Sequence, residues 1–226
     1  MSLTDVLNEI NISLSDTQKQ QFETYANLLL EWNQRMNLTA ITDRQDIYVK
    51  HFHDSLLLEY LYHPEGTLMD VGSGAGFPGL PLAINNPDLQ VTLLEPIEKR
   101  CSFLNHVVEQ LKLNNVEVVR MRAEEFSGRT FNYVTSRAVA PMNILCELCL
   151  PLTAINGHFI AMKGPKATEE LKQAQKAIRI LGGETAELRE LQLPGDQTRV
   201  FVDIIKKKTT PQGYPRSYSR IKKKPL

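Results

Sequence analysis

The sequence has few cysteines, no long apolar run and no net excess of either charge. Its 226 residues include three cysteines, 26 basic residues and 26 acidic residues. Three cysteines are too few for a disulfide framework, and no apolar run reaches the ~20 residues that a membrane span needs. The first residues also lack a basic segment followed by an apolar one, the usual pattern of a signal peptide. We therefore expect a cytoplasmic globular protein, not associated with membranes, with one large domain and a full core.

The cysteines and histidines do not form the pattern of a metal or redox site. Cys146 and Cys149 have C-x-x-C spacing, but the sequence has no second pair and they lie in the apolar run 144–150. We predict that they are buried thiols on a helix. His51 and Asp54 have the spacing of neighbours on one helix face, which favours a local hydrogen-bonded pair, with a substrate contact as the alternative. The same stretch lacks a third ligand, so we expect no metal site.

Charge is unevenly distributed along the chain. Eight of the 26 Lys and Arg residues lie from Lys206 onward, where Asp and Glu are absent, so the preceding part carries a net charge of −8. One interpretation is a basic arm that binds a polyanion such as RNA, and the other is a solvated, frayed terminus. The arm would bind RNA through Lys206, Lys207, Lys208, Arg216, Arg220 and Lys222.

The first 64 residues have helical patterns. Ser15 and Gln18 fit a capping box at a helix start. Apolar residues then recur at spacings of three and four along one helix face, at Phe22, Tyr25, Leu29, Trp32 and Met36. A second helix is expected to begin near Asp43 or Asp46 and to end before Pro64. We interpret residues 1–64 as a helical extension packed on the domain that follows.

From Thr67 onward, strand-like and helix-like segments alternate. The expected strands are 67–71, 90–95, 116–121, 131–135, 157–162, 184–193 and 199–205. The expected helices are 78–86, 97–113, 141–154 and 167–181. This alternation favours an α/β fold with a parallel sheet and helices on both faces. The last two strands, joined by a loop at Pro194-Gly-Asp, are expected to pair antiparallel. We assign residues 65–205 to this core and 206–226 to a basic tail.

A glycine-rich loop joins the first expected strand to the first expected helix, in Asp70-Val-Gly-Ser-Gly-Ala-Gly-Phe-Pro-Gly79. Glycines let the backbone turn sharply and let a ligand approach it closely. Asp70 would repel a bound pyrophosphate, whereas S-adenosylmethionine (SAM) carries a sulfonium and an ammonium but no phosphate. We therefore assign Asp70, Gly72, Gly74 and Gly76 to a SAM site. The alternative is an ordinary tight turn in an α/β domain.

Glu95 ends the second expected strand. Ligands of open α/β sheets bind beyond the carboxyl ends of the strands. A carboxylate in that place can accept hydrogen bonds from both hydroxyls of a ribose. We therefore assign Glu95 to the cofactor ribose; if the glycine loop is an ordinary turn, Glu95 is simply solvated.

Seven motifs occur along the chain in a fixed order. They are Asn37-Leu-Thr-Ala-Ile41, His51-Phe-His-Asp-Ser55, Asp70 to Gly79, Leu94-Glu-Pro-Ile-Glu-Lys-Arg100, Arg122-Ala-Glu-Glu125, Ser136-Arg-Ala-Val-Ala-Pro141 and Lys163-Gly164. In this combination the chain, from about residue 15 onward, resembles the bacterial small-subunit ribosomal RNA methyltransferase G family, also called glucose-inhibited division protein B. The ending also resembles one branch of that family, but Ser217-Tyr-Ser219 stands where a glycine is expected.

The resemblance implies a fold, an activity and a substrate. The fold is that of class I SAM-dependent methyltransferases, Rossmann-like, with a mostly parallel seven-stranded sheet and an N-terminal helical extension. The activity is methylation of N7 of a guanine in 16S ribosomal RNA, offered as RNA or as the small ribosomal subunit. We expect the enzyme to be a monomer. The alternatives are a SAM-dependent methyltransferase for a small molecule or a protein, and a non-catalytic nucleotide-binding regulatory module.

The resemblance also implies a set of cofactor contacts, made by Gly72, Phe77, Ala123, Glu124 and Arg137. The Phe77 ring either stacks on cofactor or base, or belongs to the core. Arg137 either binds guanine O6, a phosphate or the cofactor carboxylate, or pairs with Glu124 or Glu125. Lys163 either meets an RNA phosphate or is an ordinary exposed lysine.

Methylation at N7 requires no general base. N7 of guanine has an exposed lone pair, and its attack on the sulfonium methyl gives a positively charged ring without prior loss of a proton. The task of the enzyme is then to align the reacting atoms and to exclude water. We therefore name no certain catalytic residue and regard Arg137 as the candidate for orienting the substrate.

Overall fold

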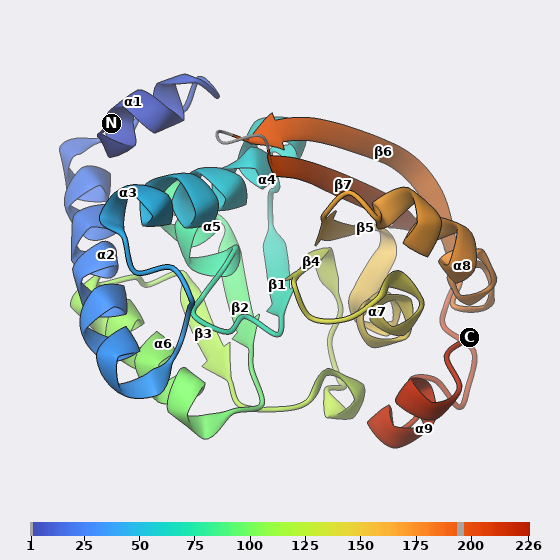
Figure 1. Ribbon diagram of the computed structural model, residues 1–226. Helices are drawn as coiled ribbons and strands as arrows, with labels where there is room; N and C mark the ends of the chain where they lie inside the picture. Colours follow the sequence, from blue (N-terminus) through green and yellow to red (C-terminus); the bar gives the residue numbers. More distant parts are fainter. Residues whose placement is uncertain (1, 194–196) are drawn as a thin grey trace.

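The computed structural model describes residues 2–193 and 197–226 (Figure 1). Its centre is a sheet that, among the described residues, has seven strands in the order β3-β2-β1-β4-β5-β7-β6. The strands are β1 Thr67–Val71, β2 Gln90–Leu94, β3 Val116–Val119, β4 Phe131–Arg137, β5 Thr153–Lys163, β6 Gly183–Leu193 and β7 Gln197–Lys206. Neighbours from β3 to β5 pair in parallel, whereas β7 is antiparallel to both β5 and β6. The predicted fold class is therefore confirmed, and Pro194 to Asp196, where a loop was expected, lie outside the described residues.

Helices cover both faces of the sheet (Figure 1). They are α1 Leu3–Asn8, α2 Asp16–Met36, α3 Arg44–Ile47, α4 Asp54–Tyr62, α5 Gly79–Asn85, α6 Glu98–Gln110, α7 Met142–Cys149, α8 Ala167–Ile180 and α9 Tyr218–Lys223. On one face, α2, α4, α5 and α6 share a hydrophobic cluster with side chains such as Leu68 of β1. On the other face, α7, α8 and α9 pack around Met69 and Val71 of the same strand. The alternation of Leu68 and Met69 between clusters follows from the two-residue period of a strand.

The N-terminal helices are an integral part of the first cluster. Ser15 Oγ accepts a hydrogen bond from Gln18 N at 3.2 Å, and Ser15 N donates to Gln18 Oε1 at 2.9 Å, so the predicted capping box is confirmed. The Gln18 side chain also donates to the carbonyls of Ile84 and Asn85, which ties α2 to the end of α5. Helix α1, capped by Ser2, was not predicted.

The second expected helix is interrupted by a π-helical segment. Asp43 caps α3, as predicted, and its side chain accepts from Asp46 N at 3.0 Å. Residues Tyr48–His53 then form a π-helix before α4 begins at Asp54. Such insertions frequently occur at functional sites, and this one lies in the motif that contains His51.

One helix on the other face ends earlier than predicted, and one strand of the sheet begins earlier. The helix expected over 141–154 ends at Cys149 and continues as a 3-10 turn, Leu150–Leu152. Pro151 accounts for the change, because it has no N–H to continue the α-helical ladder. Cys146 and Cys149 are buried in α7, as predicted. Strand β5 begins at Thr153 rather than at residue 157.

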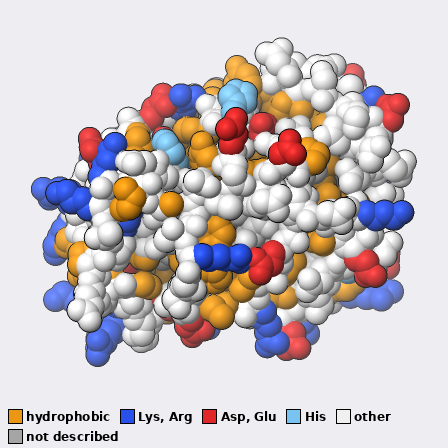
Figure 2. All heavy atoms as spheres, turned by 180° about the vertical axis from the view of Figure 1, so that it is seen from behind, with side chains coloured by type: hydrophobic (Ala, Val, Ile, Leu, Met, Phe, Trp, Pro, Cys, Tyr) orange, Lys and Arg blue, Asp and Glu red, His pale blue; other side chains and the backbone are white. Residues whose placement is uncertain are grey.

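The basic tail is a packed segment. It carries α9, and Ile221 of that helix is fully buried in the second cluster. The interpretation as a frayed terminus is therefore wrong for the described residues. Seen from behind, Lys and Arg side chains gather on the side where α8 and this segment lie (Figure 2). Within the described ranges, no helix is both long enough and apolar enough to cross a membrane.

Candidate functional site

The glycine-rich loop leaves β1 at the carboxyl edge of the sheet. Gly72 N donates to the carbonyl of Leu94 at 2.8 Å, so the loop is fastened to β2 as it turns. Gly72 has φ +73°, and a Cβ there would lie 2.6 Å from a Val139 methyl carbon. Both the conformation and the close approach therefore require glycine at this position.

Asp70 lies behind this loop, in the interior. Its carboxylate is fully buried, and Oδ2 accepts a hydrogen bond from Gly79 N, the first residue of α5, at 3.0 Å. Oδ1 has no hydrogen-bond partner among the described residues. Burial raises the pKa of Asp70 to about 7, and the bond from Gly79 opposes this rise. Asp70 thus joins the start of α5 to the end of β1.

Glu95 follows β2 and is 1% exposed. Its Oε2 accepts from Gly74 N at 3.0 Å, and its Oε1 accepts from Ile97 N at 2.9 Å. Arg100 lies 3.6 Å from Oε2. Since a carboxylate offers about four acceptor sites, two remain for the hydroxyls of a ligand.

A cavity of about 270 Å³ lies where the loops after β1, β2, β3 and β4 meet. Its size is close to the lower end of small-molecule sites, roughly 300–1,000 Å³. Four of the expected cofactor residues line it, namely Gly72, Glu95, Ala123 and Glu124. Other parts of the wall are apolar and come from Ile97, Met121 and Val139. A carboxylate, exposed loop backbone and apolar walls together fit an adenosine-containing cofactor.

The remaining expected cofactor residues lie beside this cavity and do not line it; they are Asp70, Gly74, Gly76, Phe77 and Arg137. Gly74 and Gly76 shape the loop. The Phe77 ring is buried and stacks on Tyr25 and His51, with ring centroids 5.4 Å and 4.3 Å apart. The Phe77 side chain therefore belongs to the core, which is the second of the two expected alternatives.

Arg137 belongs to a buried polar cluster on the far side of the loop. Its NH1 donates to Asp54 Oδ2 at 2.7 Å, and its guanidinium lies 5.0 Å from the centre of the Phe77 ring. Asp54 is fully buried and also accepts two bonds from Arg199, at 2.6 Å and 2.7 Å. Arg137 is therefore paired with Asp54, and not with Glu124 or Glu125. Charge-assisted bonds of this kind fix both guanidinium groups firmly.

His51 joins the same cluster through Arg137. Arg137 NH2 donates to His51 Nδ1 at 3.2 Å, and the other ring nitrogen, Nε2, lies 2.9 Å from Thr39 Oγ1. The predicted direct pair with Asp54 is therefore replaced by a link through Arg137. Burial, followed by the charge of Arg137, lowers the pKa of His51 to about 3. The ring is neutral at ordinary pH.

A second cavity, of about 340 Å³, adjoins the first. Its walls include Lys163, Gly164 and Arg199, and it shares Ala138 with the first cavity. Ala138 has φ +58°, a left-handed conformation that is uncommon outside glycine. Lys163 is paired with Glu170 at 2.7 Å and donates to the carbonyl of Ala140 at 3.0 Å. Lys163 is therefore held at the cavity wall rather than being an ordinary exposed lysine.

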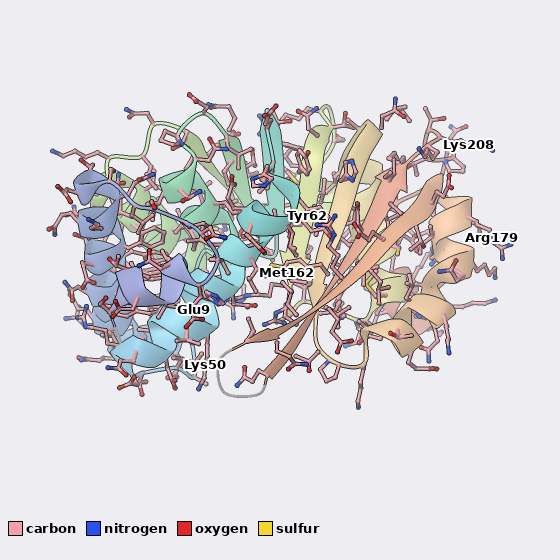
Figure 3. All side chains as sticks on the ribbon, turned by 90° about the horizontal axis from the view of Figure 1, so that it is seen from above. Glu9, Lys50, Tyr62, Met162, Arg179 and Lys208 are labelled. Atoms are coloured by element: carbon pink, nitrogen blue, oxygen red, sulfur yellow. The ribbon has the colours of Figure 1, made fainter. Side chains whose placement is uncertain are left out.

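Two basic residues of the tail are engaged inside the protein. Lys206 is 2% exposed, and its ammonium donates to the carbonyl of Leu181 and to Thr210. Arg216 forms a two-pronged ion pair with Glu147, a fully buried carboxylate. The assignment of Lys206 to RNA is corrected, because its charge is buried; Arg216 is partly exposed and already paired with Glu147. The other tail residues expected to bind RNA are exposed: Lys207, Lys208, Arg220 and Lys222. Lys208 projects outward on the same side as Arg179 (Figure 3).

Sequence reasoning missed the pairing of Asp54 with Arg199, and it missed Tyr218. Asp54 and Arg199 are 145 residues apart, and no local spacing connects them. Tyr218 of α9 lines the first cavity. An aromatic residue in a basic tail was its only signal in the sequence.

Comparisons with known proteins agree with this geometry. A family model described as GidB, rRNA small subunit methyltransferase G, matches residues 18–199. Ribosomal RNA small subunit methyltransferase G of Staphylococcus carnosus is 45% identical over 233 residues, which cover 99% of this chain and 97% of that protein. The protein of the same name from Staphylococcus aureus strain Newman is 45% identical over 232 residues, with the same coverage of both chains.

Solved structures share the fold at much lower identity. M. jannaschii TYW2, crystallised in complex with AdoMet, has a TM-score of 0.55 at 16% identity, covering 69% of this chain and 76% of its own. TrmN from Thermus thermophilus has a TM-score of 0.52 at 18% identity, covering 69% of this chain and 52% of its own. These similarities support the fold class.

Proposed function

Since this chain belongs to the rRNA small subunit methyltransferase G family, we propose that it uses S-adenosylmethionine to methylate N7 of a guanine in 16S ribosomal RNA. The main structural support for this proposal is that two cavities meet at Ala138, at the carboxyl edge of the sheet. A cofactor in the first cavity and a base in the second would place donor and acceptor side by side.

In this proposal the first cavity binds the cofactor. SAM, when bound, supplies a methyl group attached to a positively charged sulfur. The free acceptor sites of Glu95 would take the ribose hydroxyls, and Glu124, at the loop after β3, would be an acceptor for the adenine part of the cofactor. Gly72 lets the backbone approach the ligand. Asp70, Gly74, Gly76 and Phe77 act through the shape of the loop and the start of α5.

The second cavity accounts for the base. Asp54 fixes Arg137 and Arg199, and each guanidinium has N–H groups beyond those used in the cluster. Arg199 and Lys163 line the cavity, where they can donate to guanine O6 or to an adjoining phosphate. N7 reacts through its own lone pair, so the cluster needs to orient the base but not to remove a proton. A neutral His51 agrees with that requirement.

The exposed basic side chains account for the polyanion. Lys207, Lys208, Arg220 and Lys222 are exposed, and the last two belong to α9. We infer that these residues contact ribosomal RNA, either naked or in the small subunit, since phosphate contacts position a protein on a nucleic acid. The enzyme would act in the cytoplasm as a monomer, without a membrane.

Transfer of labelled methyl from SAM to small-subunit RNA tests the proposal. The RNA comes from cells that lack this protein and is offered both naked and as assembled subunits. Chemical cleavage at N7-methylguanosine should give one position. Gly74→Asp should abolish transfer, because it places a carboxylate and a side chain in the loop. Gly128→Asp is the matched control, since Gly128 also has a positive φ but lies outside the glycine loop and does not line the cofactor cavity, whereas Gly74 N donates to Glu95.

A different result would contradict the proposal. If the protein binds SAM but transfers no methyl group to either form of the RNA, a small-molecule or protein substrate, or a regulatory role, replaces it. Transfer to an atom other than N7 would agree with an RNA methyltransferase but contradict methylation at N7.

A further inference from the structure

The C-terminal segment reaches the cofactor cavity. Tyr218, the first residue of α9, lines that cavity together with Arg122, Ala123 and Glu124. The segment lies beyond residue 199, where the family match ends. It therefore supplies a wall of the cavity that neither the glycine loop nor the matched core provides.

A buried ion pair holds this segment in place. Arg216 Nε donates to Glu147 Oε1 at 2.7 Å, and Arg216 NH2 donates to Oε2 at 2.5 Å. The backbone N of Arg216 adds a third bond to Oε1, at 2.9 Å. Glu147 lies in α7 with its side chain fully buried, so it cannot exchange this partner for water. A desolvated, two-pronged pair of this kind specifies one arrangement of the chain.

An apolar anchor follows the ring. Ile221 is fully buried against the cluster that contains α7, three residues after Tyr218. Tyr218 thus lies between two fixed points, Arg216 on one side and Ile221 on the other. Its position at the cavity follows from these anchors and not from chance contact of a loose terminus.

The neighbours of Tyr218 identify the part of the cavity that it faces. The guanidinium carbon of Arg122 lies 5.8 Å from the centre of the Tyr218 ring, within the range of a cation–π contact. Arg122 precedes Ala123 and Glu124, which follow β3, whereas Glu95, assigned to the ribose, follows β2. The ring therefore lies at the end of the cavity beyond the ribose, where the base of an adenosine would be.

We propose that the C-terminal segment is a built part of the cofactor site, in which Tyr218 packs against the adenine of SAM and the Arg216–Glu147 pair positions Tyr218. The inference rests on the proposed function for the identity of the cofactor. It gives the segment a role in cofactor binding that is separate from any contact with RNA. Tyr218 is a binding residue, and Arg216 and Glu147 are positioning residues.

Binding of S-adenosylhomocysteine to the purified full-length protein tests the inference without any RNA. Tyr218→Leu should weaken binding in calorimetry by about ten-fold, since contacts between a base and an aromatic ring are worth about 1–3 kcal/mol. Tyr218→Phe should bind like the wild type, because it keeps the ring. Tyr60→Leu is the matched control: Tyr60 is an exposed tyrosine of α4 and does not line the cavity.

Proton NMR of the bound ligand separates packing from general loosening. The adenine protons should show a ring-current shift in the wild type and in Tyr218→Phe, and this shift should be absent in Tyr218→Leu. Glu147→Gln keeps the size of the side chain but removes the charge that holds Arg216. It should weaken binding and reduce the adenine shift, although Tyr218 is still present.

Either of two results would overturn the inference. Unchanged affinity and unchanged adenine shifts in a folded Tyr218→Leu would mean that the ring does not touch the base. Weaker RNA binding with normal S-adenosylhomocysteine binding would make the segment an RNA arm only. Failure of the proposed function is distinguishable, because it appears as absent methyl transfer while the binding results stand.

Discussion

The two cavities that meet at Ala138 are built in different ways. The cofactor cavity is formed mainly by short loops at the ends of adjacent strands, which supply the carboxylates of Glu95 and Glu124, and Tyr218 of the C-terminal segment adds one wall. The second cavity depends on charged side chains from distant parts of the chain, with Asp54 bridging Arg137 and Arg199. The first cavity therefore depends mostly on local sequence, with Tyr218 as its long-range contribution, and the second depends on the assembled fold.

Removing Asp54 should have the largest effect, because the second cavity depends on it. Asp54→Ala would leave two guanidinium groups without their buried partner, which typically costs about 3–5 kcal/mol of stability. Denaturant unfolding measures the decrease. Asp46→Ala is the matched control, since Asp46 pairs with Lys50 at the surface and exposed pairs contribute ~1 kcal/mol or less. If both variants lowered the free energy of unfolding equally, the second cavity would not depend on the buried pairs of Asp54.

This contrast also explains how much the sequence predicted. The succession of strands and helices along the chain follows from alternation. The glycine motif, the strand-end position of Glu95 and the family resemblance assigned Gly72, Glu95, Ala123 and Glu124 to the cofactor, and these four residues line one cavity. The pairing of Arg137 could not be predicted, because its partner Asp54 lies 83 residues earlier in a helix with no sequence link to β4.

The same limit applies to the tail. Its charge predicted a basic arm, but charge alone does not distinguish an exposed lysine from a buried one. Lys206 and Arg216 are satisfied by a carbonyl and by Glu147, partners that only the folded chain provides. The π-helix at Tyr48–His53 also had no sequence signal; its Phe52 ring packs on Phe22 and Tyr25 of α2, which are far from it in the sequence.

Asp70 allows a test of stability against pH, because it is buried behind the glycine loop of the cofactor cavity. The folded state keeps the Asp70 proton up to about pH 7, whereas the ordinary pKa is 3.8. Stability from this group therefore falls as pH rises from about 4 to 7. Asp70→Asn should gain about 4 kcal/mol relative to wild type between pH 4 and pH 8, because a rise in the pKa from 3.8 to about 7 is worth about 1.36 kcal/mol for each unit.

The measurement is denaturant unfolding of wild type and Asp70→Asn across this pH range. Asp88→Asn, at an exposed position, should show no such trend. A gain that fails to grow with pH would mean that Asp70 is ionised in the folded protein. A direct contact between Asp70 and the cofactor ammonium would then become the better explanation of its place in the loop.

Glu95 tests the cofactor cavity itself. Glu95→Gln keeps the shape but replaces one acceptor oxygen by an amide, which faces the donors Gly74 N and Ile97 N. Hydrogen bonds to charged groups are worth about 1.5–3 kcal/mol, so binding of S-adenosylhomocysteine should weaken roughly ten-fold or more. Glu98→Gln is the control, because its side chain is largely exposed. Normal binding by a folded Glu95→Gln would exclude the ribose contact.

Substitutions in the three consecutive lysines at 206–208 should have the smallest effect on RNA binding. They also compare exposed lysines directly with a buried one. Lys207 and Lys208 are exposed, whereas Lys206 is buried against the carbonyl of Leu181. Replacing Lys207 and Lys208 by Ala should weaken RNA binding slightly and reduce the slope of log K against log salt by about one for each phosphate that the variant no longer neutralises. Lys206→Met should leave that slope unchanged and lower stability instead, since it leaves a buried carbonyl without a donor. Filter binding at several salt concentrations measures the slope. If Lys206→Met reduced the slope as much as the double variant does, net charge, and not the folded position of each lysine, would determine RNA affinity.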